Sequence, residues 1–282
     1  MIVNPHRFGL CIILSLSVAS TSTSLAQTRV ADQRLADIAL REENIYRKIA
    51  EDPEFYSSSD IERHVTDLIA AYSTYLIDHP KDVNALILYG KLLRRVERFD
   101  EAFNHFLKAD ELDPNIAVVK QQIGTYLAES GKAKAALPFY LKAVELEPET
   151  AIYHFALGQL LNEFRTVYIE EGIFTRDALE REMLKAFKKA VALQPEAFEL
   201  QMRLGEAYYD LSSPDWKSAL LHWNKMRKEV ENELQAEILD LHRARVMAKL
   251  GRTTEAVTLA QKVQTPGLQN SKQQVLDEIA RH

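Results

Sequence analysis

Apolar residues recur along this chain at the spacing of amphipathic helices. Leu86, Tyr89 and Leu93 lie four positions before, one before and three after Gly90. A helix turns by about 100° per residue, so these three side chains share one face with the glycine. Comparable patterns follow one another from residue 30 onward, and none of them shows the strict alternation of a β-strand. The pattern therefore predicts an all-α protein.

The helical pattern also repeats at a fixed interval. Gly90, Gly124 and Gly158 are spaced 34 residues apart, and Pro114 and Pro148 keep the same spacing. Such a period predicts an array of helical hairpins. Between each glycine and the next proline lie a small, an aromatic and a second small residue, namely Ala102, Phe106 and Ala109, and then Ala136, Tyr140 and Ala143.

These residues resemble the tetratricopeptide repeat family, whose unit is a helix–turn–helix of this length. The resemblance covers residues 81–263 and implies a right-handed superhelical solenoid. Three divergent units continue it, marked by Gly158, Phe187 and Pro195, by Gly205, Ala219 and Trp223, and by Ala244, Gly251 and Ala256. The expected units are residues 81–114, 115–148, 149–195, 196–233 and 234–263.

Helical segments on both sides of this array are expected to cover its apolar ends. Residues 27–80 form an N-terminal helical hairpin, in which Ser59 and Glu62 have the spacing of a capping box for the second helix. Residues 264–282 form a C-terminal capping helix, and its expected capping box consists of Ser271 and Gln274.

The third unit is longer than the others. Gly158 and Gly205 are 47 residues apart, which leaves 13 extra residues. Thr175 is a suitable N-cap, so we expect a lengthened hairpin with its tip near Gly172. Apolar residues near the tip offer a second contact for a partner or another copy. Alternatively, they pack against each other or the neighbouring repeat. These residues are Tyr168, Ile169, Ile173 and Phe174.

The resemblance also implies where a partner binds. In tetratricopeptide domains, one face of each first helix lines a concave groove that holds a segment of the partner. We therefore expect an unidentified protein or peptide to bind along the corresponding face of this chain. The residues expected there are Asn84, Ile87, Leu88, Lys91, Arg94, Arg95, Gln121, Gln122, Thr125, Phe155, Gln159, Asn162, Met202, Arg203, Glu206, Tyr209, His242 and Arg245.

One part of this face is basic. Lys91, Arg94 and Arg95 suit an acidic segment or a carboxylate, because arginine can bind a carboxylate through two parallel hydrogen bonds. The alternative is that these side chains are merely solvated. A variant of the family clamps the C-terminal carboxylate of chaperones, but Ile87 and Gln121 stand where that variant has clamp residues. That specificity is therefore not carried over.

The first 26 residues have the features of a secretory signal peptide. Arg7 supplies a positive start, residues 10–19 are mostly apolar, and Ser24-Leu25-Ala26 is a small-x-small cleavage motif. Cleavage between Ala26 and Gln27 would deliver the protein to the periplasm or the exterior of a bacterium. Retention of the segment as an anchor is the alternative. Cys11 is the single cysteine, so cleavage leaves a chain without thiols.

Composition narrows the classes of function. The net charge is −6 at pH 7, which disfavours nucleic acid as a partner, because phosphates require clustered cations. The sequence lacks HExxH, GxSxG, phosphate-loop and CxxC motifs. We therefore expect neither an enzyme nor a cofactor or metal.

These observations favour an exported scaffold or adaptor that binds protein segments. Two alternatives remain open: a structural protein that assembles with copies of itself, and an accessory subunit of an envelope or secretion complex.

Overall fold

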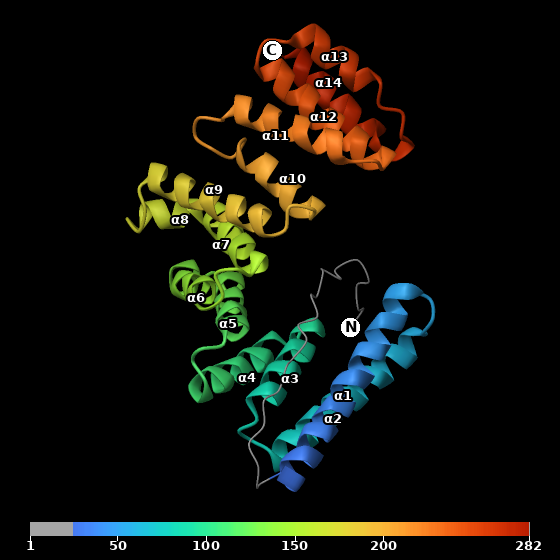
Figure 1. Ribbon diagram of the computed structural model, residues 1–282, viewed down its shortest axis with the longest axis vertical. Helices are drawn as coiled ribbons and strands as arrows, with labels where there is room; N and C mark the ends of the chain where they lie inside the picture. Colours follow the sequence, from blue (N-terminus) through green and yellow to red (C-terminus); the bar gives the residue numbers. More distant parts are fainter. Residues whose placement is uncertain (1–24, 282) are drawn as a thin grey trace. The chain divides into compact units, whose positions relative to one another are not determined.

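The computed structural model describes residues 25–281, which form helices joined by short turns (Figure 1). The predicted leader lies outside the described residues, apart from its last two positions, and so does Cys11. No β-strand occurs in residues 25–281, and the all-α prediction is confirmed. The helices are α1 Leu25–Glu51, α2 Ser58–Asp78, α3 Val83–Arg95, α4 Phe99–Leu112, α5 Ala117–Glu129, α6 Ala133–Leu146, α7 Ala151–Glu163, α8 Arg165–Glu170, α9 Arg176–Leu193, α10 Phe198–Ala207, α11 Trp216–Glu229, α12 Glu233–Lys249, α13 Thr253–Gln261, the 3₁₀ turn η2 Pro266–Leu268 and α14 Gln269–Ala280.

The chain divides into two compact units, one ending at Tyr126 and one beginning at Leu127, so the boundary falls within α5. In the first unit, α1 packs on α2, α2 on α3 and α3 on α4. In the second unit, α6 packs on α7, α7 on α9, and the contacts continue through α10 and α11 to α12, which packs on α13 and α14. Most helices thus contact their neighbours in sequence, as in helix–turn–helix repeats.

Three hairpins are closed by the same contact between a glycine of the first helix and an aromatic ring of the second. Each ring lies where the side chain of a larger residue would stand, so only glycine permits this approach. The three rings are at most 1% exposed, so each lies in the interior of its hairpin. From an added Cβ atom to the ring, the distances are 2.8 Å for Gly90 and Phe106, 2.7 Å for Gly158 and Phe187, and 2.2 Å for Gly205 and Trp223.

Two predicted helix starts were wrong by a few residues. Ser57, rather than Ser59, caps α2: its backbone is extended and its Oγ accepts a hydrogen bond from the amide of Asp60 at 3.2 Å. At the other end, α14 begins at Gln269 directly after η2, so Ser271 lies inside the helix. The motif spacing was present in both cases, but a neighbouring residue or a preceding 3₁₀ turn started the helix earlier.

The lengthened hairpin has the predicted second helix. Thr175 caps α9, because its Oγ1 accepts a hydrogen bond from the amide of Ala178 at 3.3 Å. Gly172 has a φ of +67° and forms the turn at the tip, where a left-handed backbone favours glycine. The first half of the hairpin is interrupted: α7 ends at Glu163, and α8 is a separate short helix after Phe164.

Within residues 25–281, every helix is too short or too polar to cross a membrane.

We predict that Gly205→Ala destabilises the second unit. The new methyl group would meet the Trp223 ring at 2.2 Å, and we expect this overpacking to outweigh the higher helix propensity of alanine, for a net loss of about 1–2 kcal/mol. Thermal unfolding followed by circular dichroism measures the effect. Gly267→Ala is the control, because its Cβ would meet nothing within 4 Å. Equal melting temperatures for the two variants would contradict the prediction.

Candidate functional site

The predicted partner-binding residues of α3 differ in exposure. Ile87 is only 8% exposed, so it contributes to the core of the first unit. Asn84 is exposed, and the remaining four are half-buried, namely Leu88, Lys91, Arg94 and Arg95.

The basic residue Arg95 binds a carboxylate of its own chain. Its Nη1 lies 3.1 Å from Oε1 of Glu42 on α1, and its guanidinium lies 3.9 Å from the centre of the Tyr46 ring. The other oxygen of Glu42 accepts a hydrogen bond from Tyr72 Oη at 2.8 Å. Glu42 is 9% exposed, and burial raises its pKa, although Tyr72 and Arg95 oppose the increase. The sequence predicted that Lys91, Arg94 and Arg95 bind a carboxylate of a partner. For Arg95, that carboxylate is instead Glu42 of the N-terminal hairpin.

The predicted residues of α5 in the first unit bind one another. The Gln122 side chain donates to Oε1 of Gln121 at 2.7 Å. The Gln121 amide contacts Thr125 Oγ1 at 3.2 Å, and this hydroxyl donates to the Gln121 carbonyl at 2.9 Å. All three are half-buried, so they form a small polar cluster on one side of α5.

In the second unit, predicted residues of α7, α10 and α12, together with Tyr209 in the turn after α10, form a surface that we call the polar row. It is defined as Gln159, Arg203, Glu206, Tyr209, His242 and Arg245. Arg203 connects its first members: Nε donates to Gln159 at 3.3 Å, and Nη2 lies 2.8 Å from Asp210. Its guanidinium also lies 4.7 Å from the Phe187 ring centre. The Arg203 side chain is only 13% exposed, so its guanidinium interacts mainly with groups of the same unit.

At the far end of the polar row, Arg245 also pairs with a carboxylate of the same chain. Nε of Arg245 lies 2.6 Å from Oε2 of Glu278 on α14, and Nη2 lies 3.3 Å from Oε1. Glu206 differs from Asp210 and Glu278, which pair closely with these arginines. Among the described residues, its ion pair is with Arg203 Nη1 at 3.9 Å. Burial raises the pKa of Glu206, yet its side chain is 44% exposed and can be reached from solvent.

An aromatic cluster supports the centre of the polar row. The Trp223 indole donates a hydrogen bond to the Tyr209 hydroxyl, and the His242 ring stacks on Trp223 with centroids 4.5 Å apart. Tyr209 also contacts Trp216, with centroids 5.3 Å apart. Burial, assisted by Arg245, lowers the pKa of His242 to about 4. The imidazole is therefore neutral near pH 7 and adds no positive charge to the row.

The other predicted residues of this unit lie at its margins. Phe155 and Met202 are partly buried against the core, and Asn162 accepts a hydrogen bond from the Arg165 guanidinium. Arg165 also donates to the backbone carbonyl of Asp210. These contacts favour roles in packing and positioning for the three predicted residues.

The apolar residues of the lengthened hairpin lie against the core of the second unit. Tyr168 is fully buried, and its hydroxyl donates to the carbonyl of Ala133 at 2.9 Å. Ile169, Ile173 and Phe174 are partly buried against the same core. This placement corresponds to the packing alternative and removes Tyr168 from the surface.

Three contributing residues did not follow from the sequence. Glu42, Arg165 and Glu278 complete the arginine interactions from helices outside the repeat faces that were considered. Glu42 is 53 residues from Arg95, and Glu278 is 33 residues from Arg245. A repeat pattern gives the orientation of each helix but not such pairings, and no signal in one sequence identifies them.

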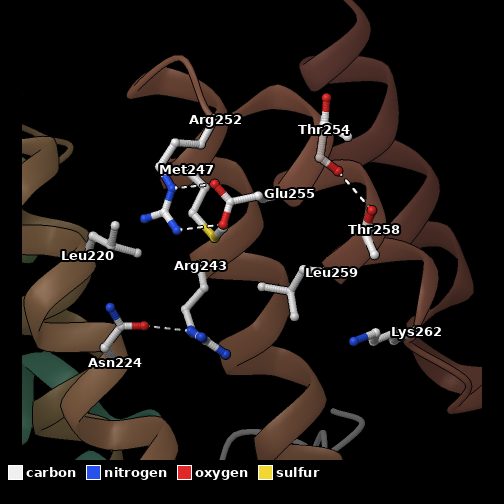
Figure 2. Close-up of a pocket in the computed structure, with 10 residues that line it drawn as sticks. All are labelled: Leu220, Asn224, Arg243, Met247, Arg252, Thr254, Glu255, Thr258, Leu259 and Lys262. Atoms are coloured by element: carbon white, nitrogen blue, oxygen red, sulfur yellow. Dashed lines mark hydrogen bonds and ion pairs between the residues drawn. The ribbon is translucent and has the colours of Figure 1, made fainter.

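A shallow pocket of about 380 Å³ lies between α11, α12 and α13, and Figure 2 shows its lining. Arg252 donates to both oxygens of Glu255 at 2.9 and 2.7 Å, and Arg243 donates to Asn224 at 2.7 Å. None of the predicted site residues lines it. Its residues are Leu220, Asn224, Arg243, Met247, Arg252, Thr254, Glu255, Thr258, Leu259 and Lys262.

No group of three or more His, Cys, Asp or Glu side chains suited to a metal occurs in the described part of the chain.

Residues 83–116 and 117–150 match the family model of the tetratricopeptide repeat and are repeats of this type. PilF of Pseudomonas aeruginosa has a TM-score of 0.61 and 14% identity, over 89% of this chain and 98% of its own. The crystal structure of PilW, a widely conserved type IV pilus biogenesis factor, has a TM-score of 0.58 and 14% identity, over 89% and 98%. At these identities the likeness shows the fold alone. No curated protein sequence matches the chain.

We predict that Arg95→Gln destabilises the first unit by about 2 kcal/mol at pH 7, because it leaves a buried carboxylate without its cation. Glu42 has a raised pKa in the folded state, so its contribution is most favourable at acidic pH and is lost as pH rises through that pKa. Removing Arg95 raises this pKa further, and the deficit should shrink on acidification. Denaturant unfolding at several pH values measures it.

The double variant Glu42→Gln with Arg95→Gln should recover part of the loss, because no buried charge remains. Arg98→Gln is the control, since it breaks an exposed pair with Glu101 and should change stability by less than about 0.5 kcal/mol. A deficit for Arg95→Gln that does not vary with pH would contradict this account of Glu42.

His242 gives the opposite pH dependence. Its folded pKa is lowered to about 4, so its stabilising contribution is complete above the ordinary value near 6.5 and is lost as pH falls from there towards 4. We expect His242→Phe to keep the stacking on Trp223. As the pH falls between these two values, the free energy of unfolding of the variant should decrease by about 2 kcal/mol less than that of the parent chain. Unfolding curves of both proteins test this, and parallel losses on acidification would contradict it.

Proposed function

We propose that this protein is an exported, non-catalytic scaffold that binds segments of a partner protein along the polar row of its second unit. The observation that supports this most strongly is that three successive first helices, α7, α10 and α12, and the turn after α10 carry polar and aromatic side chains that are exposed or half-buried. The repeats hold these groups in place before binding, so the ordering cost falls mainly on the partner.

The polar row is preferred over the face of the first unit for a physical reason. In the first unit, Ile87 is buried and Arg95 is engaged by Glu42. In the second, Gln159 is exposed and Glu206 is 44% exposed. A partner can therefore reach polar groups of the second unit without displacing a buried side chain.

The leader motif supports export, with the mature chain beginning at Gln27 in the periplasm or outside the cell. PilW, a type IV pilus biogenesis factor, shares the fold at 14% identity. A role as an accessory subunit of an envelope complex is compatible with the proposal. The leader motif supports this role, because it would direct the chain to the cell envelope.

Site-specific photo-crosslinking tests the binding surface. A photoreactive residue in place of Gln159 should crosslink a partner in extract of the source cells, and mass spectrometry should identify a recurrent segment. The control position is Glu182 on α9, whose side chain is 49% exposed and which lies outside the polar row. Equal crosslinking from both positions would contradict the proposal.

Self-assembly is the alternative that the same experiment addresses. If the recurrent crosslinked segment belongs to this chain, light scattering of the purified protein should show a mass that rises with concentration. A monomer at all concentrations, together with a foreign segment in the crosslinks, supports the scaffold.

A further inference from the structure

We infer that the partner segment carries a lysine or arginine side chain that pairs with Glu206 at the centre of the polar row. The inference rests on the proposed function, since it names the chemistry of the segment bound there. It differs from the expectation of an acidic partner that the basic residues of α3 suggested.

Negative charges outnumber positive charges around Glu206. The charges acting on it belong to Arg203, Arg245 and Asp210. Arg203 is bonded to Asp210 at 2.8 Å, and Arg245 to Glu278 at 2.6 Å. Two guanidinium groups thus face three carboxylates, and each guanidinium has a closer acidic partner than Glu206. Glu206 remains without a hydrogen-bonded cation among the described residues.

Glu206 is also accessible from solvent. With 44% of its side chain exposed, Glu206 can be approached from solvent, whereas Arg203, at 13%, cannot offer much of its charge to a ligand. Partial burial destabilises the charged form of the Glu206 carboxylate. A cation of the partner that pairs with it would stabilise that form, and this gain would favour binding.

Tyr209 supplies an aromatic ring near Glu206. It stands in the turn directly after α10, where its amide donates to the carbonyl of Glu206 at 2.8 Å. Burial and the nearby charge of Glu206 both raise the pKa of the Tyr209 hydroxyl. A carboxylate next to an aromatic ring suits a cation, which gains both ionic and cation–π attraction. Cations of the chain itself use such rings in this unit: Lys249 lies 5.9 Å from the Trp216 ring and Arg203 lies 4.7 Å from the Phe187 ring.

Selection from a library of random peptides displayed on phage, using the immobilised full-length protein, tests the inference. We expect the selected peptides to be enriched in lysine or arginine at one recurrent position. The affinity of one synthetic peptide is then measured by fluorescence anisotropy for the parent chain and for Glu206→Gln. Loss of a partly exposed pair should weaken binding about tenfold.

Glu182→Gln is the matched control, because Glu182 has a similarly exposed side chain, at 49%, on α9. Replacing the recurrent lysine or arginine of the peptide by methionine should weaken binding to the parent chain and have little further effect on Glu206→Gln. This coupling distinguishes a direct pair from a general charge effect. Melting temperatures of the variants verify that both remain folded.

Peptides that bind without enrichment in basic residues, or that bind Glu206→Gln as tightly as the parent chain, would overturn the inference and leave the proposed function standing. Enrichment in acidic or purely apolar residues would do the same. Selection of no peptide at all would count against both.

Discussion

The close contact between glycine and an aromatic ring is the constraint on which the rest of this structure depends. At Gly90, Gly158 and Gly205, the ring of the following helix occupies the space of a missing side chain. This contact sets both the separation of the two helices and the rotation of the first helix about its axis. Once that rotation is set, the residues that face away from the partner helix are set as well.

The polar row follows from this rotation. Gln159 and Glu206 each come directly after a contact glycine, and Arg203 and Tyr209 lie two before and four after Gly205. In α12 the buried Ala244 takes the place of the glycine, with His242 and Arg245 in equivalent positions. The same packing that stabilises each hairpin therefore presents one face of α7, α10 and α12 for binding.

The fold could be predicted from the sequence to a large extent, because the glycine, the aromatic residue and the helix period are all local signals. Phe187 and Trp223, which marked two of the divergent units, are buried, and Thr175 was correctly identified as a cap. The choice of Ser57 over Ser59 was missed, since two serines with similar spacing compete for one cap. The burial of Tyr168 depends on the carbonyl of Ala133 in another helix, which no local pattern encodes.

The site was less predictable, since its electrostatics depend on pairs that are distant in the sequence. Arg95 and Arg245 looked similar as exposed cations on a repeat face, but Glu42 and Glu278 engage them. The positive charges of Arg95 and Arg245 are therefore neutralised by carboxylates of the same chain. The carboxylate of Glu206 is more available to a partner than either guanidinium. The periodicity thus indicated which side chains face outward, and the tertiary contacts determine which charges are available.

The central claim is that a partner segment lies along α7, α10 and α12 of the second unit. Amide hydrogen exchange of the full-length chain, alone and with a bound partner segment, measures this most directly. The account predicts that binding slows exchange in these three helices and leaves α9, α11 and α13 unchanged. Slower exchange confined to α9, α11 and α13, or to the first unit, would contradict it.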